Sequence, residues 1–316
     1  MNHVPQLPER ELPPGRHHVL KEHLMHEIRR DAATGAEPRV GRARWMRPAV
    51  AVPAVAVIAA AATFTGVQVT SRDAEGTRAE PTQVVQLLDS IALAAEKSEA
   101  PGTIGDDQYV YVDSKVAYVS MAADGSTAPK LDPVHRRQVW KPVDGARGGL
   151  VREKLPYLPG KGETKLERDT PGVASNTNYR HLQTLPTDPA KMLEWLHQAS
   201  DGGKSEDQNT FVLVGDLSRE SLMPPKVAAA LYRATAMIPG VVVVKDAVDA
   251  AGRHGIGIGR EDAGAMTQLI FDKKTKVFLG EREVAVRDVD HVKKGDLLGV
   301  SAVMRRTVVD GLGQQP

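Results

Sequence analysis

The chain has no cysteine among its 316 residues. Disulfides, thiolate catalysis, cysteine-based zinc sites and a lipid-modified cysteine are therefore excluded. Aromatic residues make up only 4% of the sequence, so a hydrophobic core has to be built mainly from Val, Leu, Ile, Met and Ala. An excess of one charge is also missing, with 41 Lys and Arg against 40 Asp and Glu. This balance gives no reason to expect nucleic acid as a partner.

A recognisable catalytic motif is absent as well. Ser120, Ser126 and Ser175 all lack the G-x-S-x-G setting of a nucleophile elbow. The alternating glycines at 255–259 lie inside a strand pattern, with no following helix and no P-loop lysine. An exposed or bulged strand explains them better than a phosphate loop. We therefore expect a non-enzymatic protein without a cofactor, and an envelope hydrolase is the less favoured alternative.

Residues 48–71 contain no charged residue and no histidine. At a rise of 1.5 Å per residue, about 24 residues span about 36 Å, enough to cross a hydrocarbon core with some tilt. Four arginines precede this run (Arg39, Arg42, Arg44, Arg47). Basic flanks stay cytoplasmic, which predicts a single transmembrane helix over 48–70 with residues 1–47 inside the cell. A cleaved secretory signal is the alternative, but its basic head would be unusually long.

The predicted cytoplasmic segment contains one amphipathic helix, over residues 16–33. Leu20, Leu24 and Ile28 recur every four residues and form its apolar face. A helix of this length does not bury that face by itself, so the three residues are candidate contacts for a partner protein, the membrane surface or a second copy. His23 and His26 have metal-ligand spacing, but no carboxylate or cysteine completes the set, and we predict no metal site.

A polar linker over 71–81 leads to a region, 82–316, in which helical and strand patterns alternate in blocks. Helices are predicted over 82–97, 205–220 and 225–238, and a further helix begins at Pro189 behind the N-cap residue Asp188, with Met192, Leu193 and Leu196 on its buried side. Strands are predicted over 108–121, 134–143, 149–155, 241–248, 255–260, 266–272, 276–286 and 297–309, and a long loop over 156–179. The last five strands are separated by tight turns and read as a meander. The pattern predicts an extracytoplasmic α+β domain, with a curved antiparallel sheet covered by helices on one face.

Three aromatic side chains are the candidate ligand contacts of this region. Tyr109 and Tyr111 lie in the first predicted strand and Trp140 in the second. Large aromatic side chains supply much of the apolar area of binding cavities, so we expect them to line a cavity between the helices and the sheet. Ordinary packing in the core is the alternative for each of them.

Several short stretches, spread in one order over nearly the whole chain, resemble a known family. They are LPPGRH at 12–17, LKEHL at 20–24, LPTDP at 185–189, AAALYR at 228–233, IPGV at 238–241, DAAGR at 249–253, FDKKT at 271–275 and LGE at 279–281. The family consists of actinobacterial single-pass membrane proteins without an established biochemical activity, often encoded beside an extracytoplasmic-function sigma factor.

The resemblance implies a LolA/RseB-like exported domain, whose relatives bind acyl chains or unfolded envelope polypeptides. It also implies a sigma factor as a cytoplasmic partner, although the short segment 1–47 lacks the zinc motif of many anti-sigma factors. Together these observations predict a membrane-anchored sensor or ligand-binding protein of the cell envelope. A carrier-like binding protein for lipids or lipoproteins is the alternative.

Overall fold

The computed structural model describes residues 81–98, 102–120, 130–155, 162–200, 205–288 and 292–316. The predicted cytoplasmic segment, the run at 48–71 and almost all of the linker lie outside these residues. Among the helices that the structure describes, none is both long enough and apolar enough to span a bilayer.

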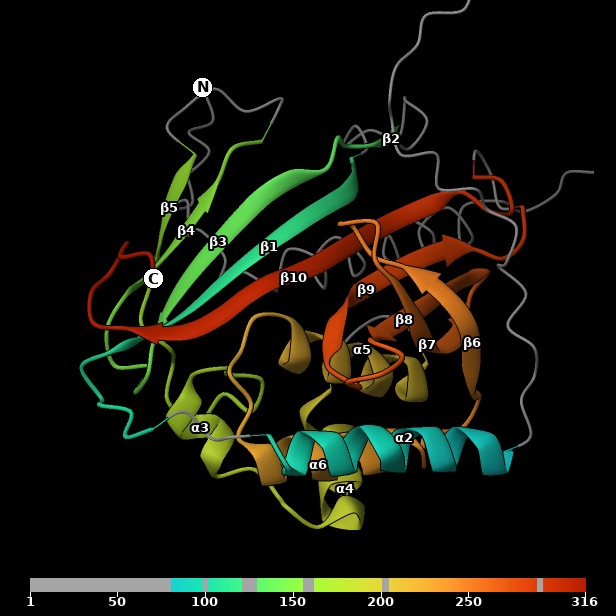
Figure 1. The fold of residues 1–316 in the computed structure, drawn as a ribbon, viewed down its shortest axis with the longest axis horizontal. Coiled ribbons are helices and arrows are strands. Elements are labelled where there is room, and N and C mark those ends of the chain that lie inside the picture. Colours follow the sequence, from blue (N-terminus) through green and yellow to red (C-terminus); the bar gives the residue numbers. More distant parts are fainter. Residues whose placement is uncertain (1–80, 99–101, 121–129, 156–161, 201–204, 289–291) are drawn as a thin grey trace, which may run out of the picture.

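The described strands form one large antiparallel sheet (Figure 1). The order across the sheet is β5-β4-β3-β1-β10-β9-β8-β7-β6, and β2 pairs with the end of β1. The strands are β1 (Tyr109–Ser120), β2 (Lys130–Leu131), β3 (His135–Pro142), β4 (Gly149–Glu153), β5 (Glu163–Leu166), β6 (Val241–Val248), β7 (His254–Asp262), β8 (Ala265–Phe271), β9 (Phe278–Ala285) and β10 (Leu297–Val309). The prediction of an α+β fold with a C-terminal meander is confirmed.

The pairing of β1 with β10 joins two meanders that are far apart in the sequence. One meander runs through β1, β3, β4 and β5, and the other runs from β6 to β10. The pairing extends from Tyr109 opposite Val309 to Tyr118 opposite Gly299, with a bulge between Asp113 and Ser114. The first and last described strands therefore lie side by side at the centre of the sheet (Figure 1).

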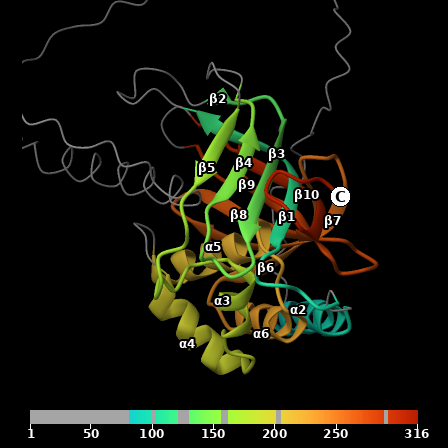
Figure 2. The same cartoon turned by 90° about the vertical axis from the view of Figure 1, so that its left-hand side faces the viewer.

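The helices all lie on one side of this sheet, as two perpendicular views show (Figures 1 and 2). They are α2 (Pro81–Glu96), α3 (Tyr179–Gln183), α4 (Pro189–Ala199), α5 (Glu206–Arg219) and α6 (Pro225–Thr235). The predicted start of α4 is confirmed, because the side chain of Asp188 accepts a hydrogen bond from the backbone N–H of Lys191 and Pro189 occupies the first turn. We call the sheet face toward the helices the inner face and the opposite one the outer face.

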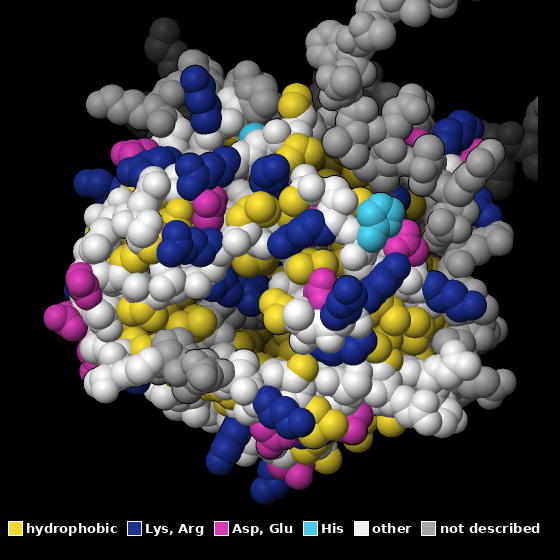
Figure 3. All heavy atoms as spheres, in the orientation of Figure 1, with side chains coloured by type: hydrophobic (Ala, Val, Ile, Leu, Met, Phe, Trp, Pro, Cys, Tyr) yellow, Lys and Arg dark blue, Asp and Glu magenta, His cyan; other side chains and the backbone are white. Residues whose placement is uncertain are grey.

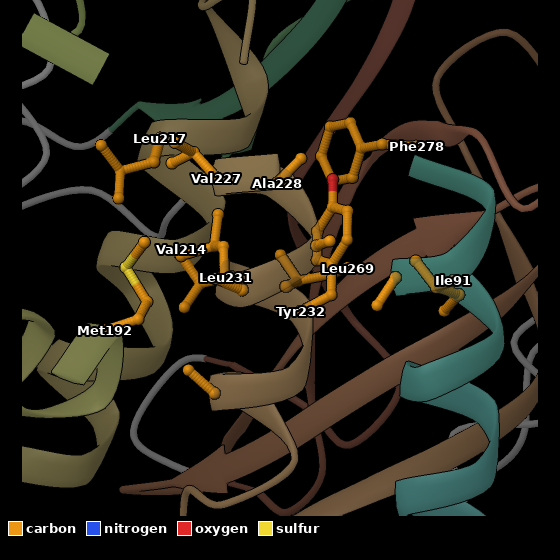
Figure 4. Packing of buried hydrophobic residues seen from close by; sticks show 14 of the residues in the cluster. Ile91, Met192, Val214, Leu217, Val227, Ala228, Leu231, Tyr232, Leu269 and Phe278 are labelled. Carbon is orange, nitrogen blue, oxygen red and sulfur yellow. The ribbon is translucent and has the colours of Figure 1, made fainter. Parts of the chain in front are cut away.

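The main core fills the space between the inner face and the helices (Figure 4). Leu88 and Ile91 of α2, Leu217 of α5 and Leu231 of α6 are fully buried there. Each such side chain contributes about 1.5–3 kcal/mol through burial. On the sheet side an edge-to-face chain of rings runs from Tyr232 through Phe271 to Phe278, with centroid separations of 5.3 and 5.6 Å.

Two predicted features of the strands need correction. The segment 156–179 was expected to be a loop, but it contains β5, which pairs with β4 from Leu166 to Glu163. That strand is short, lies at the sheet edge and has no apolar alternation, so its pairing with β4 is the main reason for its extended form. The glycines at 255–259 do lie in a strand, β7, opposite a bulge in β6, but they are buried. A Cβ on Gly257 would lie 3.0 Å from the Cβ of Val244, so close packing accounts for the absence of a side chain there.

Candidate functional site

The three aromatic residues predicted to contact a ligand do come together, but on the outer face of the sheet. Tyr109, Tyr111 and Trp140 form a cluster with Leu150 and Val309 that is separate from the main core. The rings of Tyr111 and Trp140 are 5.0 Å apart and almost completely buried. We call these five residues the outer aromatic cluster.

The C-terminal end of the chain covers the outer aromatic cluster. The indole Nε1 of Trp140 donates a hydrogen bond of 2.6 Å to the carbonyl oxygen of Gln314. The guanidinium of Arg152 lies 5.0 Å from the Trp140 ring, and that of Arg147 lies 4.7 Å from the Tyr109 ring. The expected position between the helices and the sheet is therefore wrong, whereas a role of these rings in ligand binding stays a prediction.

The alternation of side chains along a strand explains the error. In β1, Val110 and Val112 contribute to the main core, so the residues on either side of them point away from the helices. In β3, Trp140 stands opposite Tyr111 and shares its face. Sequence periodicity identifies these two sets of residues but does not say which set meets the helices.

The inner face of the same strands carries charged side chains near the end of α5. Arg137 of β3 forms ion pairs with Glu153 of β4 and with Glu220 just beyond α5, and its Nε lies 2.6 Å from the Glu220 Oε1. His135 Nε2 lies 2.8 Å from the other oxygen of Glu153. About one eighth of each of the Arg137, Glu153 and Glu220 side chains is exposed. These ion pairs are thus largely withdrawn from water.

A second group of charges attaches α5 to β9. Arg219 forms ion pairs of 2.7 Å with Glu281 of β9 and with Asp216 of its own helix. The carboxylate of Glu281 lies against Gly215, where a Cβ would overlap it. A glycine in the middle of a helix costs about 1 kcal/mol relative to alanine, and here it permits the close approach of the helix to the sheet. We call the set Arg137, His135, Glu153, Glu220, Arg219, Asp216 and Glu281 the inner charged network.

Burial and pairing shift the pKa values in this network in opposite directions. Burial alone would raise the pKa of Glu220, but the positive charges of Arg137 and Lys141 outweigh it and lower that pKa to about 2. Burial raises the pKa of Glu281 to about 7, against the attraction of Arg219. The network thus contains one carboxylate that stays ionised and one that titrates near neutral pH.

Arg306 of β10 lies where the inner charged network meets the main core. Its Nη2 donates hydrogen bonds to the carbonyl oxygens of Ser218 and Arg219, the last residues of α5. Its guanidinium carbon lies 5.5 Å from the Phe278 ring centre, and burial lowers its pKa. A cation at a helix C-terminus is favourable, because the carbonyl groups there carry partial negative charge.

Two buried polar atoms near this place have no hydrogen-bond partner in the described part of the chain. They are the Nε of Arg306 and the Oγ of Ser114. Arg306 pairs across the strands with Val112, two residues before Ser114, so both side chains lie on the inner face of neighbouring strands. Because an unpaired buried polar group costs about 1–3 kcal/mol, such a pair of atoms calls for an explanation.

Sequence reasoning did not identify any residue of the inner charged network. A signal was present in β3, where His135, Arg137 and Lys141 alternate in step with the buried Val139. Charged residues are unusual at strand positions that alternate with the core residues, and their presence here predicts that this face of β3 carries buried charge. The partners Glu220 and Glu281 carry no comparable local signal.

The histidines that the structure describes outside the inner charged network do not lie close together. His181, His197 and His254 contact the Ala174 carbonyl, Glu206 and Asp246 respectively, at three separate places. In the described ranges no group of three or more His, Asp or Glu residues is placed to hold a metal ion. Leu20, Leu24 and Ile28, the predicted partner contacts, lie outside the described residues, and so do His23 and His26.

Comparison with known proteins gives matches at the level of structure alone. No family model matches the chain, and no curated protein matches it. Among solved structures, the complex of MucA and MucB from Pseudomonas aeruginosa is similar at 12% identity, with a TM-score of 0.23. The alignment covers 74% of this chain and 58% of the matched one.

A LolA superfamily protein from Nitrosomonas europaea is similar at 12% identity with a TM-score of 0.19, over 72% of this chain and 94% of the other. The chain spans less than two thirds of the length of the MucB structures that it matches. At these scores the similarities add nothing to the argument, and the α+β assignment rests on the strand order and the helical layer described above.

Proposed function

We propose that the chain is a membrane-anchored extracytoplasmic binding protein whose ligand engages the inner face of the sheet beside Arg306. The unpartnered Arg306 Nε and Ser114 Oγ carry this proposal. Both atoms are able to donate a hydrogen bond, and both lie at the border of the apolar core. A lipid or peptide with an acceptor group and an apolar body would satisfy both parts of such a site.

The proposal requires the sheet and the end of α5 to separate slightly, because both atoms are enclosed. Ion pairs such as that of Arg219 with Glu281 hold this end of α5 beside the buried Leu217, and α5 contains Gly215 at the contact with β9. Ion pairs in partly buried places contribute less net stability than their geometry suggests, because desolvation of the charges opposes their attraction. We therefore place the entry of the ligand at this end of the helical layer.

Native mass spectrometry of the full chain purified in detergent tests the proposal. We expect a co-purifying ligand that is reduced or lost in Ser114→Ala and in Arg306→Met. Arg287→Met is the matched control, because Arg287 is an exposed arginine just after β9 that belongs neither to the inner charged network nor to the neighbourhood of Arg306. An empty wild-type chain, or equal ligand retention in all variants, would contradict a ligand site at this position.

The regulatory part of the proposal concerns residues 1–47. We propose that Leu20, Leu24 and Ile28 contact a cytoplasmic partner, for which the sigma factor implied by the family resemblance is the candidate. Capture from a cell extract with a 1–47 peptide is expected to recover that partner. The variant Leu20→Glu/Leu24→Glu/Ile28→Glu is expected to recover none, since charges on the apolar face prevent helix docking. Equal recovery by both peptides would contradict the assigned contacts.

A further inference from the structure

Lys and Arg side chains gather on the outer face over β1, β3, β4 and β10 (Figure 3). The strand register places five cationic residues on this face (Lys115, Arg136, Arg152, Lys165, Arg305). Two carboxylates lie among them, those of Asp113 and Glu163. We call these five cationic residues the outer basic face.

The two carboxylates are already occupied. Asp113 accepts two hydrogen bonds of 2.8 Å from Arg136, and Glu163 lies 2.8 Å from Arg152. The other three cations, Lys115, Lys165 and Arg305, are exposed and pair with no carboxylate in the described part of the chain. The outer basic face therefore carries a net positive charge that the residues described by the structure do not neutralise.

The strands fix the spacing of these charges. Neighbouring strands lie about 4.8 Å apart, and the buried outer aromatic cluster supports β1 and β3 from the same side. Because Tyr109, Tyr111 and Trp140 are enclosed, the surface presents charge without exposed aromatic rings. A single-stranded nucleic acid site would offer rings for base stacking, and a stable protein interface would offer an apolar centre. The outer basic face is therefore suited to bind a partner through complementary negative charge.

We propose that the outer basic face docks on the surface of an anionic lipid bilayer. This inference rests on the proposed membrane anchor. The run 48–71 ends about nine residues before α2 begins, and nine extended residues reach about 30 Å at most. The domain is thus held within about one domain diameter of the bilayer. At the bilayer surface, anionic lipids raise the binding constant by about fivefold for each Lys or Arg. Docking would fix which side of the domain is turned toward the membrane.

Energy transfer from a dye on the full chain to labelled lipids in bilayer discs measures the docking. The absence of native cysteine makes single labelling unambiguous. Met304→Cys places the dye next to Arg305, and Leu93→Cys places it on α2 in the helical layer; both residues are exposed. In discs containing phosphatidylglycerol we expect more transfer from position 304 than from position 93. The difference should vanish in phosphatidylcholine discs and in about 1 M NaCl, where the Debye length is about 3 Å.

Two triple variants with the same change in net charge separate the outer basic face from general electrostatics. Lys115→Gln/Lys165→Gln/Arg305→Gln is expected to lower the ratio of docked to undocked domain by about 100-fold. The control Lys97→Gln/Lys191→Gln/Lys226→Gln removes three exposed charges from the helical side and should leave the ratio unchanged. Equal transfer in neutral and anionic discs, or equal loss in the two variants, would overturn the proposal.

Failure of the anchor is detected separately, by flotation of the full chain with neutral vesicles in about 1 M NaCl, where electrostatic attraction is screened. A chain that does not float there has no anchor. For a chain without an anchor, docking is measured with phosphatidylglycerol vesicles, as flotation that occurs at low salt and is lost at high salt. Flotation that the first triple variant loses and the control keeps supports the outer basic face, and a wild-type chain that does not float overturns it.

Discussion

The two faces of the central strands differ in how they are stabilised, although they are built from alternate residues of the same segments. On the outer face, Trp140 and Tyr111 are packed with apolar neighbours under the C-terminal end of the chain. On the inner face, Arg137 forms ion pairs with carboxylates from two other elements. Packing of apolar area is insensitive to pH, whereas paired charges are not. The outer aromatic cluster therefore contributes stability that does not depend on pH, whereas the ion pairs on the inner face, beside the main core, are able to respond to pH.

The largest expected effect is on the outer face. Trp140→Ala removes a fully buried ring and its hydrogen bond to Gln314, and should lower the free energy of unfolding by about 4 kcal/mol. Urea unfolding of the full chain in detergent measures this loss, which should be the same at about pH 5 and about pH 8. Trp140→Phe is the control and should lose much less. A loss that changes with pH would show that a titrating group is coupled to the cluster.

Arg137→Met on the inner face should lower the free energy of unfolding by about 3 kcal/mol, because it leaves Glu220 and Glu153 largely buried without their main cation. The pairing lowers the pKa of Glu220 to about 2 from an ordinary 4.5, so its contribution is complete above about pH 4.5 and is lost as the pH falls through 2. The double variant Arg137→Met/Glu220→Gln should recover part of the loss. Losses that simply add would contradict the coupling of these two residues.

Glu281→Gln tests a pKa shift on the same face that is opposite in direction to that of Glu220. Burial raises the pKa of Glu281 from 4.5 to about 7, so the folded chain holds this proton more tightly than the unfolded chain. Its contribution to stability is complete below about pH 4.5 and is lost as the pH rises through 7, a change of about 3 kcal/mol. Unfolding measured across this range should show a shallower pH dependence in Glu281→Gln. An unchanged slope would assign the titration to another group.

The smallest expected effect is that of Gly215→Ala, which should lower the free energy of unfolding by about 1–2 kcal/mol. Helix propensity alone would favour alanine by about 1 kcal/mol, but the new methyl group overlaps the Glu281 carboxylate and moves α5 away from β9. Gly102→Ala is the matched control, because no atom lies within 4 Å of its Cβ position. A gain in stability from Gly215→Ala would show that the contact between helix and sheet is loose.

Most of the regular elements could be predicted because their signals are local. The start of α4 follows from Asp188 and Pro189, and β6 to β10 follow from alternating residues between turns. β5 was missed because its sequence, Glu-Thr-Lys-Leu, has no apolar period and is extended only because β4 offers it a partner. The segment 1–80 stays a matter of prediction.

The site was predicted less well than the fold. The grouping of Tyr109, Tyr111 and Trp140 was foreseen, but the face on which they lie was not. The partners of Arg137 and Arg219 come from β4, β9 and the end of α5, which are distant in the sequence. Such charge pairs arise from tertiary contact, and no local pattern announces them.

The sequence by itself determined most of the elements, the alternation along the predicted strands and the absence of cysteine chemistry, because each of these depends on neighbouring residues or on composition. Only the tertiary structure decided that β10 pairs with β1 and that Val110, rather than Tyr109, faces the helices. A strand with apolar residues on both faces has no intrinsic inner side. Here the helical layer covers one face and the C-terminal residues cover the aromatic cluster on the other, and that choice separates the aromatic residues from the inner charged network.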